Sequence, residues 1–278
     1  MSKIAFRERG SGSVLICLHG YAGNALQWDG VANQLENNFK VVIPNLSHLT
    51  MGKENITFSD QVELIATFIK TNYPNQIVSL AGISFGGSLT WALASRYPDL
   101  VDKVIFINPM PPDPKGSFAL LYLKIFFEFT IKAPIIYIFL NSFIGKLFLK
   151  KVAFVFRNLQ GEFENERVSN LQGRKLQFVA HLLYKFAWII NNERWSLWRY
   201  KLEFWTHDCL LIYDVRDPLF RESFYLKFSQ TLACENVVQT QNAGHISIVQ
   251  EPRLIAGAIR EFLLRNTTMS PNNSDFAS

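Results

Sequence analysis

Cysteine is scarce in this chain of 278 residues, which contains three: Cys17, Cys209 and Cys234. An odd number of cysteines, two of them in or beside apolar runs, argues against a disulfide framework and favours a reducing compartment. The N-terminus also lacks a basic segment followed by an apolar run, the pattern of a secretory signal peptide. These two absences lead us to expect a cytoplasmic protein.

Patterns for metal and nucleotide binding are also missing. No cysteines and histidines have metal-ligand spacing, and neither the phosphate-loop nor the dinucleotide-binding fingerprint occurs. We therefore expect no cofactor and no metal. The apolar run that begins at Ala133 stays uncharged only until Lys146, short of the ~18 residues that a membrane-spanning helix needs.

What the sequence does contain is an alternation of strand-like and helix-like segments. Apolar runs typical of buried parallel strands occur at 14–18, 39–43, 77–81, 104–108 and 209–212. Segments with apolar residues at helical spacing lie at 59–71 and 252–265. This alternation predicts an α/β fold, with a mostly parallel central sheet and helices on both faces.

The pentapeptide Gly82-Ile83-Ser84-Phe85-Gly86 stands between one of these strands and a helix-like segment at 87–96. A G-x-S-x-G sequence in this context predicts a sharp turn that exposes the serine hydroxyl above the sheet, and glycine is needed where the turn is too tight for side chains. The bare pentapeptide could be a chance loop, but the flanking strand and helix favour catalysis. We predict Ser84 as a nucleophile.

A serine nucleophile needs a base, and the base needs an acid that fixes its tautomer. His245 follows the apolar strand 236–239 in a Gly-His loop, which suits the base. The loop after strand 209–212 offers two carboxylates, Asp214 and Asp217. We favour Asp217, which precedes Pro218, because Asp214 is closer to the strand and aspartate favours turns. The order Ser, Asp, His is the one expected for this type of turn.

A tetrahedral intermediate also needs two backbone N–H donors for its oxyanion. One is expected from Phe85, the residue after the nucleophile. The other is expected from the loop after strand 14–18, which reads His19-Gly20-Tyr21, and there we select Tyr21. We interpret His19 as a structural residue that braces this loop.

These motifs resemble those of the α/β-hydrolase superfamily, in particular serine hydrolases of the carboxylesterase and lipase kind with a helical lid. The resemblance covers the segment 19–28, the turn at Ser84, the Asp217 loop and the Gly-His pair at 244–245. Two positions depart from it. Many relatives have an Asp-x-x-Gly-x-Gly loop where 44–50 stands here, and many have glycine in place of Asp214. Neither departure removes a predicted catalytic group.

The resemblance implies a domain organisation. A first part of the hydrolase core would span 1–110 and a second part 205–266, followed by a polar, disordered tail at 267–278. Between them, at 111–204, the strand rhythm stops, and Lys124, Glu128 and Lys132 form one polar stripe on an otherwise apolar helical pattern. We expect an inserted helical lid here. Its apolar residues can pack as a core, bind a long acyl chain, or lie on a membrane surface.

Together the residues and the resemblance predict a serine hydrolase that cleaves a carboxylic ester with a hydrophobic acyl or alcohol group. A thioesterase or a pimeloyl-carrier-protein methyl ester carboxylesterase would use the same groups, and a non-catalytic ligand receptor on this fold is a further alternative. The expected partner is a hydrophobic small-molecule or acyl-carrier ester, not a nucleic acid. A net charge of +5 fits acidic lipids or an acidic carrier without requiring either. Peripheral membrane contact and the oligomeric state stay open.

Overall fold

The computed structural model describes residues 4–21, 23–47, 49, 56–110 and 205–265. The predicted lid at 111–204 and tail at 267–278 lie outside these residues, so both stay predictions. No helix within the described ranges is both long and apolar enough to cross a lipid bilayer.

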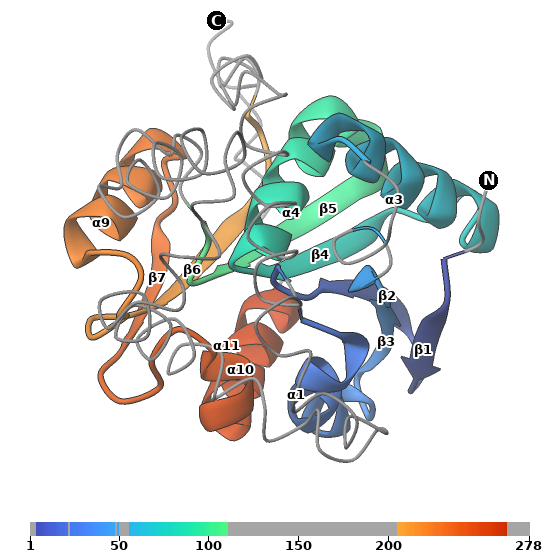
Figure 1. The fold of residues 1–278 in the computed structure, drawn as a ribbon. Helices are drawn as coiled ribbons and strands as arrows, with labels where there is room; N and C mark the ends of the chain where they lie inside the picture. The colour runs from blue at the N-terminus through green and yellow to red at the C-terminus, as the bar shows by residue number, and fades with distance from the viewer. Residues whose placement is uncertain (1–3, 22, 48, 50–55, 111–204, 266–278) are drawn as a thin grey trace, which may run out of the picture.

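The described residues form one central sheet of seven strands in the order β1-β3-β2-β4-β5-β6-β7 (Figure 1). The strands are β1 (Phe6–Arg9), β2 (Ser13–Leu18), β3 (Phe39–Pro44), β4 (Val78–Ile83), β5 (Val101–Ile107), β6 (Cys209–Asp214) and β7 (Asn236–Thr240). Only β1 is antiparallel to its neighbour, and every other pair is parallel. The predicted mostly parallel sheet is therefore confirmed.

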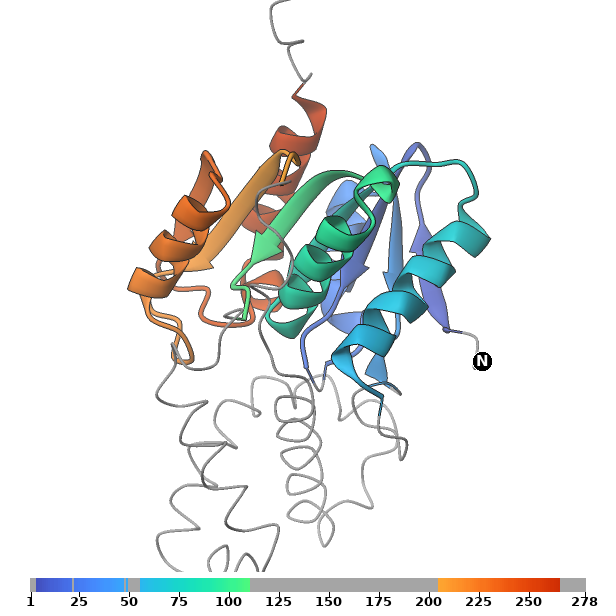
Figure 2. The same ribbon diagram turned by 90° about the horizontal axis from the view of Figure 1, so that it is seen from above.

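Helices cover both faces of the sheet, as Figures 1 and 2 show. One face carries α3 (Phe58–Asn72), α4 (Phe85–Arg96) and α9 (Glu222–Thr231); the other carries α1 (Asp29–Leu35), α10 (Ser247–Gln250) and α11 (Pro252–Leu264). Short 3-10 turns lie at Ala25–Trp28 and Pro98–Leu100. Alternate residues of β2 enter opposite cores: Ile16 and Leu18 on the first face, Leu15 and Cys17 on the second. Because both faces are covered, the strand sequence is continuously apolar rather than alternating.

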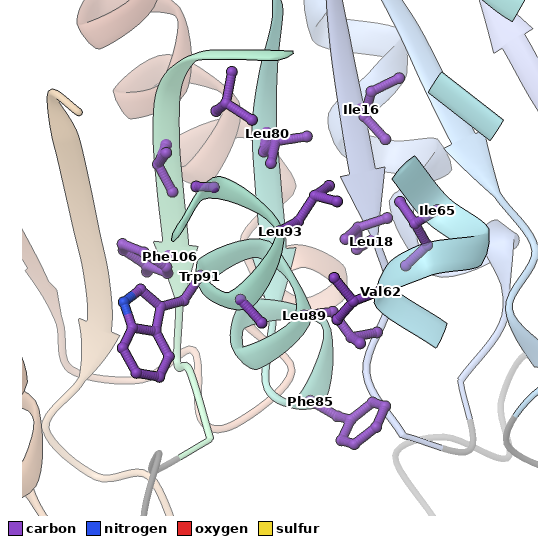
Figure 3. Close-up of a cluster of buried hydrophobic side chains, with 14 of the residues drawn as sticks. Ile16, Leu18, Val62, Ile65, Leu80, Phe85, Leu89, Trp91, Leu93 and Phe106 are labelled. Carbon is purple, nitrogen blue, oxygen red and sulfur yellow. The ribbon is translucent and has the colours of Figure 1, made fainter. Parts of the chain in front are cut away.

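Helix α4 is packed deeply, and this fixes the turn that precedes it. Every residue from Phe85 to Ala94 is buried. Figure 3 shows Leu89 and Leu93 of this helix beside Leu18 of β2 and Val62 of α3. A helix buried nearly all round is held by its neighbours rather than by its own propensity. The start of α4 is thus a rigid support for the residue before it.

Several chain segments meet at the carboxyl edge of this parallel sheet. The turn after β4, the residues after β5 and β6, and the loop after β7 all leave the sheet at this edge. Open α/β sheets bind ligands at this edge, outside the carboxyl ends of the strands. The predicted site residues lie in these segments and in the loop after β2.

Candidate active site

Ser84 lies in the sharp turn between β4 and α4, where the backbone has φ 53° and ψ −120°. A positive φ is rare for a residue with a side chain, and such strained turns cluster at functional sites. Close packing requires the flanking glycines: a Cβ on Gly82 would lie 2.3 Å from the carbonyl oxygen of Gly86, and one on Gly86 would lie 2.3 Å from that of Leu18. The strand–turn–helix context that the sequence predicts is present.

His245 connects Ser84 to Asp217. Its Nε2 lies 2.9 Å from the Ser84 Oγ, and its Nδ1 lies 2.7 Å from the Asp217 Oδ2. A carboxylate at Nδ1 fixes the hydrogen on that nitrogen, which leaves Nε2 free to accept the serine proton. The His245 side chain is 10% exposed and that of Asp217 is fully buried. The structure therefore brings together the three side chains that the sequence selects.

The Asp217 carboxylate is held by donors on both oxygens. Its Oδ1 accepts the backbone N–H groups of Leu219 at 2.7 Å and Phe220 at 3.3 Å. Its Oδ2 accepts the Tyr225 hydroxyl at 2.5 Å as well as His245. Burial by itself would raise the pKa of Asp217, but the charge of His245 and the hydrogen bonds hold the pKa below its usual value. The carboxyl group is therefore ionised at neutral pH.

Asp214, which the sequence placed in this loop, is the last residue of β6 and makes different contacts. Its Oδ1 accepts the backbone N–H of Arg216 at 2.8 Å, which is the turn role expected from the sequence. Its Oδ2 accepts the Thr240 hydroxyl and the backbone N–H of Ala243, each at 2.7 Å. Asp214 thus holds the loop that carries His245, whereas the Asp217 carboxylate meets the imidazole.

The two residues selected for the oxyanion lie next to Ser84. Phe85 is the first residue of α4, and its ring is 5.7 Å from that of Tyr21 in an edge-to-face contact. Gly20, which precedes Tyr21, approaches so closely that an added Cβ would lie 3.4 Å from the Ser84 Cβ. The loop after β2 and the start of α4 therefore meet at the serine. The backbone N–H roles of Tyr21 and Phe85 stay a prediction.

His19 braces the loop after β2, as interpreted from the sequence. It is buried, its Nδ1 lies 2.9 Å from the Gly20 carbonyl oxygen, and its Nε2 accepts the backbone N–H of Leu46 at 2.8 Å. Nδ1 thus contacts its own loop after β2, and Nε2 joins that loop to the loop after β3. This role fits a structural residue rather than a second base.

The sequence did not indicate that Tyr225 and Asn108 contact the site. Tyr225 stands on the amphipathic helix α9 and reads there as a core residue. Asn108 falls at the end of an apolar run and reads as the last residue of a strand, yet β5 ends at Ile107. An asparagine followed by proline at the carboxyl end of a parallel strand is the one signal that could have drawn attention to Asn108.

The chain belongs to the alpha/beta hydrolase fold family, whose model matches residues 13–252. Curated relatives include a Drosophila melanogaster protein named "Probable serine hydrolase", 32% identical over 110 residues, or 37% of this chain and 33% of that protein. A pimeloyl-[acyl-carrier protein] methyl ester esterase of Pseudoalteromonas atlantica is 30% identical over 111 residues, or 40% of this chain and 43% of that protein. The match thus spans less than half the length of each of these curated relatives.

Solved structures of other proteins are similar to this chain in fold. A thermophilic esterase from Thermogutta terrifontis has a TM-score of 0.67 at 18% identity, covering 94% of this chain and 92% of that chain. An epoxide hydrolase from Bacillus megaterium has a TM-score of 0.64 at 16% identity, covering 94% and 96%. Different activities occur on this fold, so the likeness identifies the architecture and leaves the reaction to be argued from the site.

Removing the Tyr225 hydroxyl is expected to weaken the hold on Asp217. The hydroxyl donates to the ionised carboxylate and so helps to lower the pKa of Asp217. Its contribution to the free energy of unfolding is fully present at pH values above the ordinary carboxyl pKa. This contribution is lost as the pH falls through the lowered pKa of the folded state. For Tyr225→Phe we expect a loss of about 2 kcal/mol in the free energy of unfolding at neutral pH, typical of a hydrogen bond to a charged group. Urea unfolding at several pH values should show this loss shrinking in acid.

The Tyr225→Phe variant should also lower kcat about tenfold, which corresponds to ~1.4 kcal/mol of barrier. Tyr73→Phe is the matched control, because the Tyr73 hydroxyl also donates to a carboxylate, that of Glu8, at 2.6 Å. Glu8 is in β1, at the opposite edge of the sheet from β6 and β7. The control variant should lose some stability but no activity. Equal kcat values for the two variants would contradict a role of Tyr225 in holding Asp217.

Proposed function

We propose that this chain is a serine hydrolase that cleaves a carboxylic ester with a hydrophobic acyl or alcohol group. The observation that carries the proposal is the hydrogen-bonded series of Ser84, His245 and Asp217. His245 Nε2 lies 2.9 Å from the Ser84 Oγ, and His245 Nδ1 lies 2.7 Å from the Asp217 Oδ2. This is the arrangement that turns a weakly nucleophilic hydroxyl into an acyl acceptor. Family membership and the names of the curated relatives agree with it.

In the acylation half of the reaction, the Ser84 Oγ attacks the ester carbonyl carbon while His245 Nε2 takes the hydroxyl proton. Asp217 keeps the imidazole oriented and stabilises its positive charge. The carbonyl oxygen becomes an oxyanion, which we assign to the backbone N–H groups of Phe85 and Tyr21. When the carbon–oxygen bond to the alcohol breaks, His245 returns the proton to the leaving alcohol, and the acyl group stays on Ser84.

In the second half, water replaces the alcohol. His245 Nε2 takes a proton from the water as its oxygen attacks the acyl carbon, and the proton then passes to the Ser84 Oγ as the acid leaves. Each step uses proton transfer and fixed dipoles supplied by this chain. The proposed reaction accordingly needs no cofactor and no metal.

The choice of ester chemistry within the family follows from the nucleophile. Epoxide and halide hydrolysis on this fold use aspartate at the nucleophile position, whereas this chain has Ser84 there. A complete series from Ser84 to Asp217 also argues against a ligand receptor without catalysis. Thioester hydrolysis would use the same groups. The relative from Pseudoalteromonas atlantica makes a carrier-bound methyl ester the second candidate substrate.

The preference for a hydrophobic substrate is supported by the apolar sequence of 111–204, whether that segment binds an acyl chain or a membrane surface.

A panel of p-nitrophenyl esters from acetyl to palmitoyl tests this proposal. Each buried methylene contributes at most ~0.8 kcal/mol, so kcat/KM should rise by a factor on the order of hundreds as the acyl chain lengthens from about two to eight carbons. Thioesters of the same acyl groups separate esterase from thioesterase activity, and anionic vesicles in a parallel series test membrane contact. A flat dependence on chain length would reject a hydrophobic acyl site.

A further inference from the structure

Asn108 has an unusual backbone and a fully buried polar side chain. It follows the last residue of β5, it has φ 39°, and none of its surface is exposed. Its backbone N–H donates to the Ile212 carbonyl oxygen of β6 at 2.9 Å, which fixes it to the neighbouring strand. A positive φ outside glycine costs on the order of 1 kcal/mol or more, and burial of an amide is costly unless it is hydrogen-bonded. The contacts of the side chain show where that cost is offset.

The amide of Asn108 joins the ends of two strands to the loop that carries His245. Its Nδ2 donates to the carbonyl oxygens of Gly244 at 3.0 Å and His245 at 2.9 Å, and it also lies 3.1 Å from the Ser247 Oγ. Its Oδ1 accepts the backbone N–H of Asp214 at 2.9 Å. The polar contacts of this side chain thus serve the His245 loop or the end of β6.

Asp214 holds the same loop from the other side. Its carboxylate accepts the Thr240 hydroxyl at the end of β7 and the backbone N–H of Ala243. Between these anchors the chain turns at Gly244, which has φ 58° and space around the position of a Cβ. A glycine in open space does not define the path of the chain by itself. The two polar anchors therefore contribute to the direction of the His245 side chain.

We propose that Asn108 is a positioning residue for the base: it holds the carbonyl groups of Gly244 and His245 so that the imidazole reaches Ser84 and Asp217 together. This inference rests on the proposed function. A misplacement of 1 Å in a reacting group can cost about 10²-fold in rate. The imidazole has to satisfy two short contacts at once, so a small shift of its backbone breaks at least one.

The chemistry of the side chain explains why an amide stands at this position. The two loop carbonyls need hydrogen-bond donors, and the Asp214 N–H needs an acceptor. Asparagine supplies both from one short planar group, whereas an ionised carboxylate only accepts. Asparagine also tolerates a positive φ better than most residues with a side chain. A residue that only filled space here would need none of these properties.

The variant Asn108→Gly tests the proposal, because glycine accepts the positive φ and only the amide is lost. We expect the rate constant for reaction of Ser84 with a fluorophosphonate probe to fall about 10²-fold. The matched control is Asn75→Gly, the same change at an exposed asparagine with φ 59° that follows α3. This control should react like the wild type.

A second variant and a spectroscopic readout separate positioning from stability. Asn108→Asp keeps the shape of the side chain and the acceptor for the Asp214 N–H but loses the donors, and it should also react slowly. Proton NMR should show a strongly deshielded signal from the hydrogen between His245 Nδ1 and Asp217 in the wild type and in Asn75→Gly. Both Asn108 variants should lose this signal at temperatures where circular dichroism shows a folded protein.

The outcomes distinguish this inference from the proposed function. If either Asn108 variant keeps the wild-type labelling rate and the NMR signal, the positioning role is wrong. If the wild type does not react with the probe, the proposed function fails. The NMR comparison still decides in that case, because loss of the signal in the Asn108 variants supports the positioning of His245 and its retention overturns it.

Discussion

The Ser84→Ala variant is expected to lose turnover almost completely. Alanine keeps the Cβ that already fits the turn at φ 53°, so the fold and its stability should stay close to those of the wild type. Only the Oγ is removed, and loss of such a nucleophile costs on the order of 10⁶ in kcat. Hydrolysis of p-nitrophenyl esters and labelling by a fluorophosphonate measure the effect, with circular dichroism as the check on folding.

Ser88→Ala provides the matched control on the same helix. Ser88 lies one turn further along α4, is buried, and donates its hydroxyl hydrogen to the Met110 carbonyl oxygen at 3.1 Å. Its loss removes this buried hydrogen bond and should cost about 1 kcal/mol of stability while leaving the nucleophile in place. Near wild-type hydrolysis by Ser84→Ala would end the serine-hydrolase proposal.

The second large effect is expected at Asp217. In Asp217→Asn the amide can accept from backbone N–H groups, but it no longer carries the charge that orients His245, and the imidazole then adopts the wrong tautomer. The same change in the Ser-His-Asp triad of a serine protease costs on the order of 10⁴ in kcat, and we expect a loss of that order here. Steady-state kinetics with a short-chain ester should show the loss in kcat, since the aspartate does not contact the substrate.

Asp214→Asn makes the same chemical change three residues upstream. Asp214 accepts hydrogen bonds from Thr240 and Ala243 and does not hold the imidazole, so the variant should lose stability, by about 1–3 kcal/mol, and far less activity than Asp217→Asn. Should Asp214→Asn prove the more damaging of the two in kcat, the assignment of the acid would have to be reversed.

Local sequence patterns were sufficient where a function depends on neighbouring residues. The turn at Ser84 needs glycines two positions to either side because the backbones meet there, and this spacing is visible in the sequence. The apolar runs likewise predicted the parallel strands of the sheet, whereas β1 (Phe6–Arg9) has no apolar run and was not predicted. The predicted first and last residues of the strands were less accurate. Strand β4 is Val78–Ile83 rather than 77–81, and Ile77, which is 65% exposed, lies outside the sheet.

Tertiary contacts account for what the sequence did not reveal. Strand β5 begins at Val101, which pairs with Val78 of β4, rather than at the predicted 104. Lys103, which lies within this extension, is buried and donates to the carbonyl oxygens of Phe262 and Arg265 at the end of α11. In the sequence, a charged residue at this position indicates a loop. Only the structure shows that the carbonyl groups at the end of α11 accept hydrogen bonds from the Lys103 side chain. Asn108 gives the same lesson, since its partners Gly244 and His245 are 136 and 137 residues away.

The pairing of β5 with β6 also has a consequence for how the protein is made. Strand β5 ends at Ile107 and β6 begins at Cys209, so this parallel pair joins segments that leave the ribosome far apart in time. Ser84 and His245 are 161 residues apart, on opposite sides of that junction. The entropy lost in closing such a long loop opposes folding until the contacts between the two segments have formed, so folding is slow. On the proposed function, the nascent chain carries its nucleophile through most of synthesis without a base, and hydrolytic activity begins only after the last strand has been added to the sheet.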